Sequence, residues 1–374
     1  MRKILILTGR YLPGYKDGGP LRTLINITES LGDEYEFYII CLDRDHGDEK
    51  AYSNILRDAW NQVGKAKVWY VSPGGWTFSF LRKMIHKVDM VYLTSFYDAY
   101  GYKTLLLNRV GLVRNCKVAL ASMGVFSEGA LSHKSFKKKS FINLCKMLGL
   151  FKGITWSVTS ELEKQDVERC IGKNLECVIA EDLPRTSVPG KKQNLSSQTT
   201  KIIFLSRICP QKNLLFAIKI LQNISVEIIF DIYGPIQDEI YWNKCKEELK
   251  KLSENVQWSY KGNAEPEKVQ EIFSEYDVFL FPTMGENYGH VIFEALSVGC
   301  IPVISDQTPW KEIMEKNAGY ILGLNRLQEF SKAIETFVDM ELSEKMQMAQ
   351  SAVQIAKDKV EKNREETGYR KIFG

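Results

Sequence analysis

Short strand-like runs and helical patterns alternate along the whole chain. The predicted strands are residues 3–8, 35–41, 67–71, 89–94, 116–121 and 154–158 in the first half, and 201–206, 225–232, 256–260, 276–281 and 301–305 in the second. The predicted helices are 20–32, 98–112, 136–149, 160–170, 212–223, 238–252, 266–274, 288–298 and 309–316, followed by 326–338 and 342–362. Alternation of this kind produces parallel sheets covered by helices. The predicted fold class is therefore α/β.

A polar segment, residues 184–200, separates two such series. It is rich in turn-forming residues and has almost no apolar ones, which is typical of a linker. A chain of 374 residues is long enough for two hydrophobic cores of about 150–200 residues each. We therefore predict a doubly wound, Rossmann-like domain over 1–183, the linker, and a second Rossmann-like domain over 201–359.

Composition argues against several classes of protein, among them nucleic-acid-binding, membrane-spanning and metal-binding proteins. The hydrophobic fraction of 44% and the charged fraction of 26% are those of a globular protein, and a net charge of +4 is too small to imply nucleic-acid binding. The N-terminal apolar run is too short for a signal peptide, and no apolar stretch is long enough to span a membrane. The eight cysteines are scattered and the four histidines lack ligand spacing. We expect a cytoplasmic protein with reduced thiols and no metal site.

The most informative stretch follows the predicted strand 276–281. Parallel sheets bind ligands at the carboxyl ends of their strands, where the next helix begins. That helix is expected to start near Asn287, Tyr288 and Gly289, where unpaired backbone N–H groups favour a phosphate. Glu286, in the loop before the helix, is placed to accept hydrogen bonds from sugar hydroxyls.

Glu294 lies further along the same predicted helix. Its spacing allows a second contact with a ligand, but it also allows a solvated stripe formed with Asn287, His290 and Ser297 on one helical face. Spacing alone leaves both interpretations open.

Arg207 and Lys212 form a second cluster, between the predicted strand 201–206 and the next helix. Together they could neutralise a diphosphate, Arg207 as a planar fork and Lys212 as a point charge. Two surface cations are the alternative, but cations near a helix N-terminus oppose its dipole unless an anion lies between them.

Gly18 and Gly19 follow the first predicted strand. Paired glycines let the backbone approach a ligand closely, although a Gly-Gly turn is more often only a turn. The pattern is not G-x-G-x-x-G, so the sequence predicts no dinucleotide fingerprint.

Two charged segments have a less specific pattern. Asp43-Arg44-Asp45 matches a D-x-D metal pattern, but the charged loop after it favours solvated surface. The segment 130–153 contains Lys134, Lys137, Lys138 and Lys139 but no acidic residue, and its apolar residues recur at roughly helical spacing. That pattern fits contact with an anionic membrane as well as a core-facing helix with a charged outer side.

Together the clusters resemble glycosyltransferase family 4, a retaining family with the GT-B fold. Residues 286–294, E-N-Y-G-H-V-I-F-E, match the E-x7-E motif of that family, and residues 205–213, L-S-R-I-C-P-Q-K-N, match its Arg/Lys phosphate signature. Smaller matches occur at 158–163, 233–235 and 305–310. The resemblance covers essentially the whole chain.

The resemblance implies two Rossmann-like domains facing across a cleft, a nucleotide-diphosphate sugar as donor, and no cofactor or metal. It also implies that residues 360–374 cross back to the first domain. The implied catalytic residues are Glu286, Arg207 and Lys212. The implied donor-binding residues are Gly18, Gly19, Arg207, Lys212, Gly234, Asn287, Tyr288, Gly289 and Glu294, with Glu286 at the sugar hydroxyls, Glu294 at the ribose, and the two cations at the diphosphate.

The implied activity is retaining, metal-independent hexosyl transfer to a glycan or lipid-linked acceptor, in the biosynthesis of a surface or capsular polysaccharide at the inner face of the membrane. Met123 stands where many relatives have the histidine of a His-Gly pair, so no first-domain histidine is assigned a role. A sugar-nucleotide epimerase or phosphorylase of the same fold, and a non-catalytic sugar-nucleotide-binding assembly partner, are the alternatives.

Overall fold

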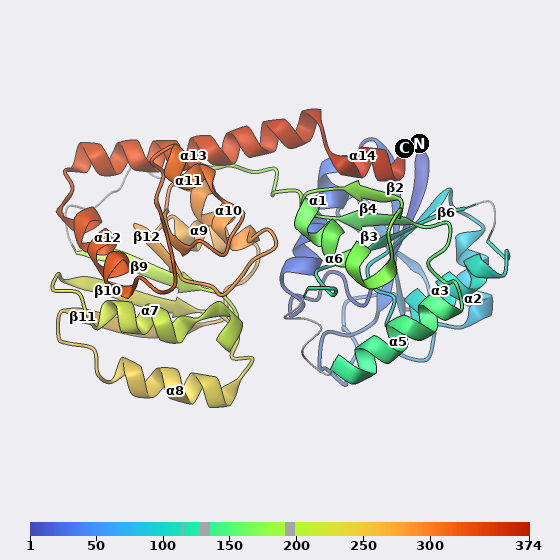
Figure 1. The fold of residues 1–374 in the computed structure, drawn as a ribbon, viewed down its shortest axis with the longest axis horizontal. Helices are drawn as coiled ribbons and strands as arrows, with labels where there is room; N and C mark the ends of the chain where they lie inside the picture. The colour runs from blue at the N-terminus through green and yellow to red at the C-terminus, as the bar shows by residue number, and fades with distance from the viewer. Residues whose placement is uncertain (114–115, 128–134, 191–198) are drawn as a thin grey trace. The chain divides into compact units, whose positions relative to one another are not determined.

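The computed structural model describes residues 1–113, 116–127, 135–190 and 199–374. The chain divides into two compact units, each built on its own sheet (Figure 1). The first unit comprises Met1–Leu183 and Lys362–Gly374, and the second comprises Pro184–Glu361.

The first unit contains an eight-stranded sheet in the order β3-β4-β2-β1-β5-β6-β7-β8. Its strands are β1 (Arg2–Leu7), β2 (Tyr35–Leu42), β3 (Trp60–Val63), β4 (Ala66–Val71), β5 (Met90–Leu93), β6 (Lys117–Ala121), β7 (Thr155–Val158) and β8 (Cys177–Ile179). Every neighbouring pair is parallel except β3 and β4, which form an antiparallel hairpin at the edge. The helices of this unit are α1 (Gly19–Leu31), α2 (Phe78–Ile85), α3 (Ala99–Arg109), α5 (Ser135–Met147), α6 (Glu161–Ile171) and α14 (Gly368–Phe373).

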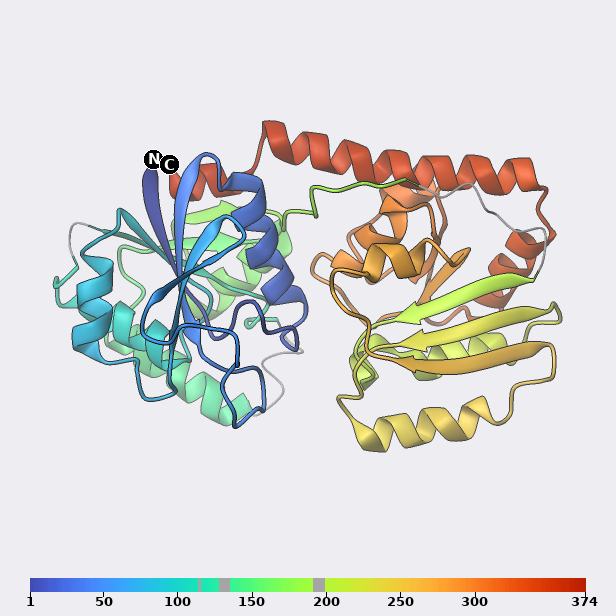
Figure 2. The ribbon, with the colours of Figure 1, turned by 180° about the vertical axis from the view of Figure 1, so that it is seen from behind.

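The second unit contains a six-stranded parallel sheet in the order β11-β10-β9-β12-β13-β14. Its strands are β9 (Thr200–Leu205), β10 (Ile228–Tyr233), β11 (Val256–Gly262), β12 (Val278–Phe281), β13 (Ile301–Ser305) and β14 (Tyr320–Leu322). Its helices are η1 (Pro210–Lys212), α7 (Leu214–Leu221), α8 (Glu239–Leu249), α9 (Val269–Phe273), α10 (His290–Ser297), α11 (Glu312–Glu315), α12 (Leu327–Asp339) and α13 (Leu342–Glu365), the last of which ends in the first unit. In Figure 2 the arrowheads of β9, β10 and β11 lie at one edge of this sheet.

The central strands are continuous apolar runs because helices cover both faces of each sheet. Ile4–Leu7 of β1 and all of Val278–Phe281 of β12 are buried. In β1 the polar residues Arg2 and Lys3 stand at the start of the strand and β12 has none, so at these strands the chemistry lies in the loops that follow.

The predicted α/β class and the long elements are confirmed, but several short elements, the helix α14 among them, were not predicted. Helix α2 and strands β3, β8 and β14 have between three and eight residues each. β3, Trp60–Val63, contains Asn61 and Gln62 and pairs only at the sheet edge. Segments this short span too few residues to show a clear hydrophobic period, and their tertiary partners decide their conformation.

Helix α14 belongs to the core of the first unit although it ends the chain. Phe373 is fully buried, and its ring lies 5.6 Å from that of Tyr35, 5.7 Å from that of Phe37 and 5.6 Å from that of Tyr92. Arg370 adds a two-armed ion pair with Glu34, with N–O distances of 2.6 and 2.8 Å. This guanidinium lowers the pKa of Glu34 below its ordinary value.

We predict that Phe373→Ala lowers the free energy of unfolding of the first unit by about 3–5 kcal/mol, because it leaves a cavity among aromatic rings. Equilibrium denaturation in guanidinium chloride measures the change. Lys371→Ala is the control, since this exposed side chain of the same helix makes only a 3.8 Å ion pair with Glu366. Equal losses in the two variants would contradict a core role for α14.

Candidate active site

The loops after β9 and β12 meet at the point where the chain order of the second sheet reverses. The chain runs from β9 outward through β10 and β11, then returns to place β12 beside β9. The two strands are parallel, so their carboxyl ends lie at the same edge. Such a reversal point is where open α/β sheets bind ligands.

Lys212 and Glu286 contact each other directly across this point. Lys212 Nζ, at the end of η1, lies 2.5 Å from Glu286 Oε1, in the loop after β12. Both side chains are largely buried. The structure therefore brings together two of the three candidate catalytic residues.

Thr283 holds Glu286 from the other side. This buried hydroxyl donates to Glu286 Oε1 at 3.1 Å, and the Glu286 backbone N–H donates to the Gln307 carbonyl at 3.0 Å. The loop is also tied to η1, because Met284 N–H donates to the Gln211 carbonyl and Asn213 Nδ2 to the Pro282 carbonyl. The carboxylate thus has a fixed position.

The turn at 287–289 leads into α10 as the sequence indicates. Gly289 is the N-cap, with a φ of 81° that glycine adopts without strain. The Tyr288 ring is buried against Trp310, with ring centroids 5.3 Å apart, and its carbonyl accepts from the Trp310 indole N–H. Asn287 is exposed. The backbone of this turn is therefore rigidly supported beside Glu286.

Glu294 is not part of a solvated stripe. Its side chain is only 4% exposed, and Ser297 on the same face is fully buried. Arg185 Nη1 lies 3.6 Å from Glu294 Oε2, and Arg185 also donates to Gln270 Oε1. The solvated alternative for Glu294 is wrong.

Arg207 follows β9 and is half-buried. No ion pair or hydrogen bond to its guanidinium occurs among the described residues. Gly234, after β10, packs closely on Ser206, the residue before Arg207. A Cβ at Gly234 would lie 1.8 Å from the Ser206 carbonyl oxygen. The candidate residues after β9, β10 and β12 therefore share one edge of the sheet.

The glycine pair of the first unit occupies the corresponding position there. In the first sheet the order reverses between β1 and β5, and Gly18 and Gly19 follow β1. Gly18 caps α1, and its carbonyl accepts from Arg22 N–H at 3.1 Å. Gly19 is exposed, and a Cβ there would meet nothing within 4 Å.

One prediction on the first unit was wrong. Asp43 and Asp45, expected on a solvated surface, are only 1% and 3% exposed. Asp43 contacts Arg44 and Arg57, and Asp45 accepts backbone N–H groups. The charged residues after D-x-D favour a solvated surface, but Asp45 is buried against the loop after β1 and Asp43 lies beside Arg44 and Arg57, contacts that the local sequence does not reveal.

Met123 and Gly124, in the stretch without a histidine, form a turn in which both residues have positive φ. The buried carboxylate of Glu163 accepts from Gly124 N–H at 2.5 Å and from Thr159 N–H at 2.6 Å. His133 lies outside the described residues.

Two supporting residues had no sequence signal. Thr283 lies three residues before the E-x7-E motif and has no pattern of its own, and Arg185 lies in the predicted linker while its partner Glu294 is on α10. The described part of that linker belongs to the second unit, where Gly190 N–H donates to the Ser297 carbonyl.

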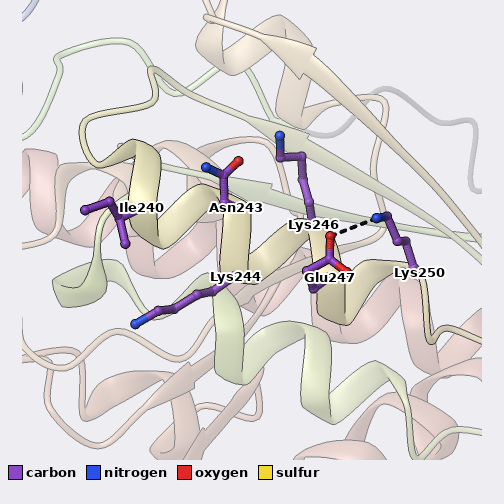
Figure 3. Close-up of a pocket in the computed structure, with 6 residues that line it drawn as sticks. All are labelled: Ile240, Asn243, Lys244, Lys246, Glu247 and Lys250. Carbon is purple, nitrogen blue, oxygen red and sulfur yellow. Dashed lines mark hydrogen bonds and ion pairs between the residues drawn. The ribbon is translucent and has the colours of Figure 1, made fainter.

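A hollow of about 590 Å³ lies elsewhere, on the exposed side of α8 (Figure 3). Its lining is Ile240, Asn243, Lys244, Lys246, Glu247 and Lys250. None of the candidate site residues lines it. Within the described ranges, no group of three or more His, Cys, Asp or Glu side chains is arranged to hold a metal.

The chain was compared with known families and structures. A family model described as glycosyl transferases group 1 matches residues 190–355. Among solved structures, Anabaena HepE in complex with UDP and glucose is similar at a TM-score of 0.72 and 14% identity, over 96% of this chain and 95% of HepE. Sucrose-phosphate synthase from Thermosynechococcus elongatus is similar at a TM-score of 0.73 and 13% identity, over 100% and 99% of the two chains. The fold is GT-B.

A third GT-B relative is WaaG, a glycosyltransferase involved in lipopolysaccharide biosynthesis, with a TM-score of 0.65 and 12% identity over 96% of this chain and 98% of WaaG. No curated protein sequence matches the chain. The matched range 190–355 contains every candidate residue of the second unit, from Arg207 to Glu294.

We predict that Gly234→Ala destabilises the second unit more than Gly262→Ala does. Both glycines have positive φ, but a Cβ at Gly262 meets nothing within 4 Å whereas one at Gly234 clashes with Ser206. Backbone strain alone costs about 1–3 kcal/mol, and only Gly234→Ala adds a steric overlap. Chemical denaturation compares the two, and equal losses would show that the close approach to Ser206 is relaxed at no cost.

Proposed function

We propose that the protein is a glycosyltransferase that transfers a sugar from a nucleotide-diphosphate donor to an acceptor hydroxyl. The observation that carries the proposal is the Lys212–Glu286 ion pair at the reversal point of the second sheet. The match of residues 190–355 to the glycosyl transferases group 1 model supports it.

In the proposed complex, Arg207 and Lys212 bind the diphosphate. A diphosphate competes with Glu286 for the ammonium group of Lys212, 2.5 Å away in the free protein. Its binding releases one carboxylate oxygen, which then accepts hydrogen bonds from the donor sugar. The ion pair thus holds both groups in place until the donor replaces it.

Other backbone and side-chain groups complete the proposed donor site. The N–H groups of the Asn287–Gly289 turn face the phosphates at the start of α10, where the helix dipole favours negative charge. Glu294, held by Arg185, accepts from the ribose. Gly234 keeps the loops after β9 and β10 close together, and Gly18 and Gly19 contribute backbone contacts from the first unit.

The proposed reaction breaks the bond between the anomeric carbon and the diphosphate oxygen and forms a bond from that carbon to the acceptor oxygen. The acceptor proton passes to the leaving diphosphate, and attack on the same face retains the configuration. Arg207 and Lys212 stabilise the charge that grows on the leaving group. No step requires a metal ion or a cofactor.

For the acceptor we propose a glycan or lipid-linked oligosaccharide, with the enzyme adding a hexose during biosynthesis of a surface or capsular polysaccharide in the cytoplasm. The similarity to HepE, crystallised with UDP and glucose, and to WaaG, involved in lipopolysaccharide biosynthesis, supports this setting. A thermal-shift screen with UDP, GDP and ADP sugars identifies the donor, because a ligand that binds the native state raises its melting temperature.

We predict that Arg207→Ala and Lys212→Ala each lower kcat for sugar transfer about 10²–10³-fold, the usual effect of losing one preorganised group that stabilises transition-state charge. Glu286→Gln should also lower turnover, since it removes the charged acceptor for the sugar hydroxyls. Release of nucleoside diphosphate with acceptor present measures the rate.

Lys219→Ala is the matched control for this series, because Lys219 is an exposed cation on α7. If Arg207→Ala and Glu286→Gln both retain full turnover, the site assignment is wrong. An isomerised donor without transfer would instead indicate an epimerase, phosphorolysis of a glycoside would indicate a phosphorylase, and tight donor binding without turnover would indicate a non-catalytic partner.

We also infer that α5 contacts an anionic membrane. Its inner side packs into the core through Ile142 and Cys145, but its outer side exposes Phe136 and Met147, which are 84% and 77% exposed. These two residues are about three turns apart on one face. No described helix is long and apolar enough to cross a membrane.

Exposed cations surround these apolar side chains. Lys137, Lys139, Lys146 and Lys152 are exposed, and the segment 135–153 has no acidic residue. A helix face with this composition lies in the interface of anionic bilayers. Lys138 is half-buried, and Lys134 lies outside the described residues.

We predict that Lys137→Glu with Lys139→Glu lowers binding to vesicles containing phosphatidylglycerol about tenfold or more, since each lysine near an anionic surface contributes about 1 kcal/mol. Sedimentation with anionic and with neutral vesicles measures it. Lys244→Glu with Lys246→Glu on α8 makes the same change in charge elsewhere and should have no effect. Absence of sedimentation of the unmodified protein at low salt would remove the membrane contact.

A further inference from the structure

The loop after β1 is anchored by one buried carboxylate. Asp45 Oδ2 accepts the backbone N–H groups of Tyr15 at 2.9 Å and Lys16 at 3.3 Å, and Asp45 Oδ1 accepts that of His46 at 2.7 Å. The carboxylate is only 3% exposed. Its negative charge is therefore matched by backbone donors rather than by water.

The loop packs closely on this anchor. A Cβ at Gly14 would lie 2.3 Å from the Tyr52 hydroxyl oxygen and 3.3 Å from Asp45 Cγ. The Gly14 backbone N–H is also satisfied, because it donates to the Tyr11 carbonyl at 3.0 Å. The chain therefore has little room to shift between Gly14 and Lys16.

Two weaker links join this loop to the loop after β2, and a third, between Arg10 and Asp17, lies within the loop after β1. Lys16 Nζ lies 2.5 Å from Asp48, and Asp17 lies 3.6 Å from Arg10 and 3.4 Å from His46. Exposed ion pairs of this kind contribute little because water screens them. The buried Asp45 carboxylate is thus the main constraint.

The anchored residues lead directly into the glycine pair. Lys16 is two residues before Gly18, which has a φ of 63° and caps α1. Only Asp17 separates the anchored backbone from this cap, so the position of Lys16 N–H fixes where α1 begins. The same Asp45 hydrogen bonds therefore also fix the position of Gly19, whose Cα has open space beside it.

We propose that Asp45 is a positioning residue for donor binding: it fixes the loop after β1 so that Gly18 and Gly19 present their backbone in one geometry to the donor. This inference rests on the proposed function for the role of the glycines, but the anchoring itself does not. Asp45 contacts neither the donor nor the reacting atoms; it acts through the backbone of residues 15–18.

The test uses the variants Asp45→Ala and Asp45→Asn, with Asp48→Asn as the control. The control removes one negative charge from the same loop, but the Asp48 side chain contacts only the side chain of Lys16. Hydrogen exchange of the Tyr15 and Lys16 amides should accelerate at least tenfold in Asp45→Ala, with a smaller change in Asp45→Asn, which retains one acceptor oxygen. The control should exchange like the unmodified protein. If Asp45→Ala does not fold, as judged by circular dichroism, Asp45→Asn decides.

Kinetics with the donor identified by the thermal-shift screen supply the second readout. Asp45→Ala should raise the KM for the donor about tenfold and change kcat less, whereas a purely structural role would change neither once the protein is folded. Unchanged exchange at Tyr15 and Lys16 would overturn the anchor. Faster exchange with an unchanged donor KM would overturn the positioning role.

The failure of the proposed function is distinguishable from these outcomes. If Arg207→Ala also leaves transfer unaffected, the donor site in the second unit is wrong, and with it the role given to the glycines. The exchange experiment still decides whether Asp45 anchors the loop.

Discussion

The parallel pairing of β9 with β12 is the contact on which the candidate site depends. Val278 aligns with Ile202 and Phe279 with Ile203, although β10, β11 and their helices intervene along the chain. Because both strands run in the same direction, everything that follows them lies at one edge. The Lys212–Glu286 contact depends on this register, because a slip of one residue between the two strands would shift one loop against the other by about 3.3 Å.

Several buried carboxylates lie in the loops or helices that follow the strands of both units, beside cations or hydrogen-bond donors. Glu286 has Lys212 and Thr283, and Glu294 has Arg185, while Glu163 accepts two backbone N–H groups and Asp45 accepts three. A buried charge without such partners would cost more than a small domain can offset. The apolar strands supply the rigidity of each unit, and these carboxylates fix the loops that extend from it.

The sequence predicted the long elements and the motifs because both depend on local pattern. Strand 276–281 is a continuous apolar run, and the loop with Glu286 and Gly289 follows it in the printed order. The predicted solvent exposure of Asp43-Arg44-Asp45 was wrong, because the burial of Asp45 depends on its contacts with the backbone of residues 15 and 16, which no local pattern reveals. Arg185 and Thr283 were missed for the same reason: their partners are set by tertiary packing.

Helix α14 has a consequence for how the protein is made. Tyr369, Ile372 and Phe373 complete the core that contains β1 and β2, which precede them by more than 300 residues along the chain. A ribosome releases the chain from the N-terminus onward, so the earliest strands must wait for the final helix before their apolar face is covered. The second unit can acquire its own core sooner. The order of synthesis therefore delays completion of the core of the first unit until the chain of the second unit has been made.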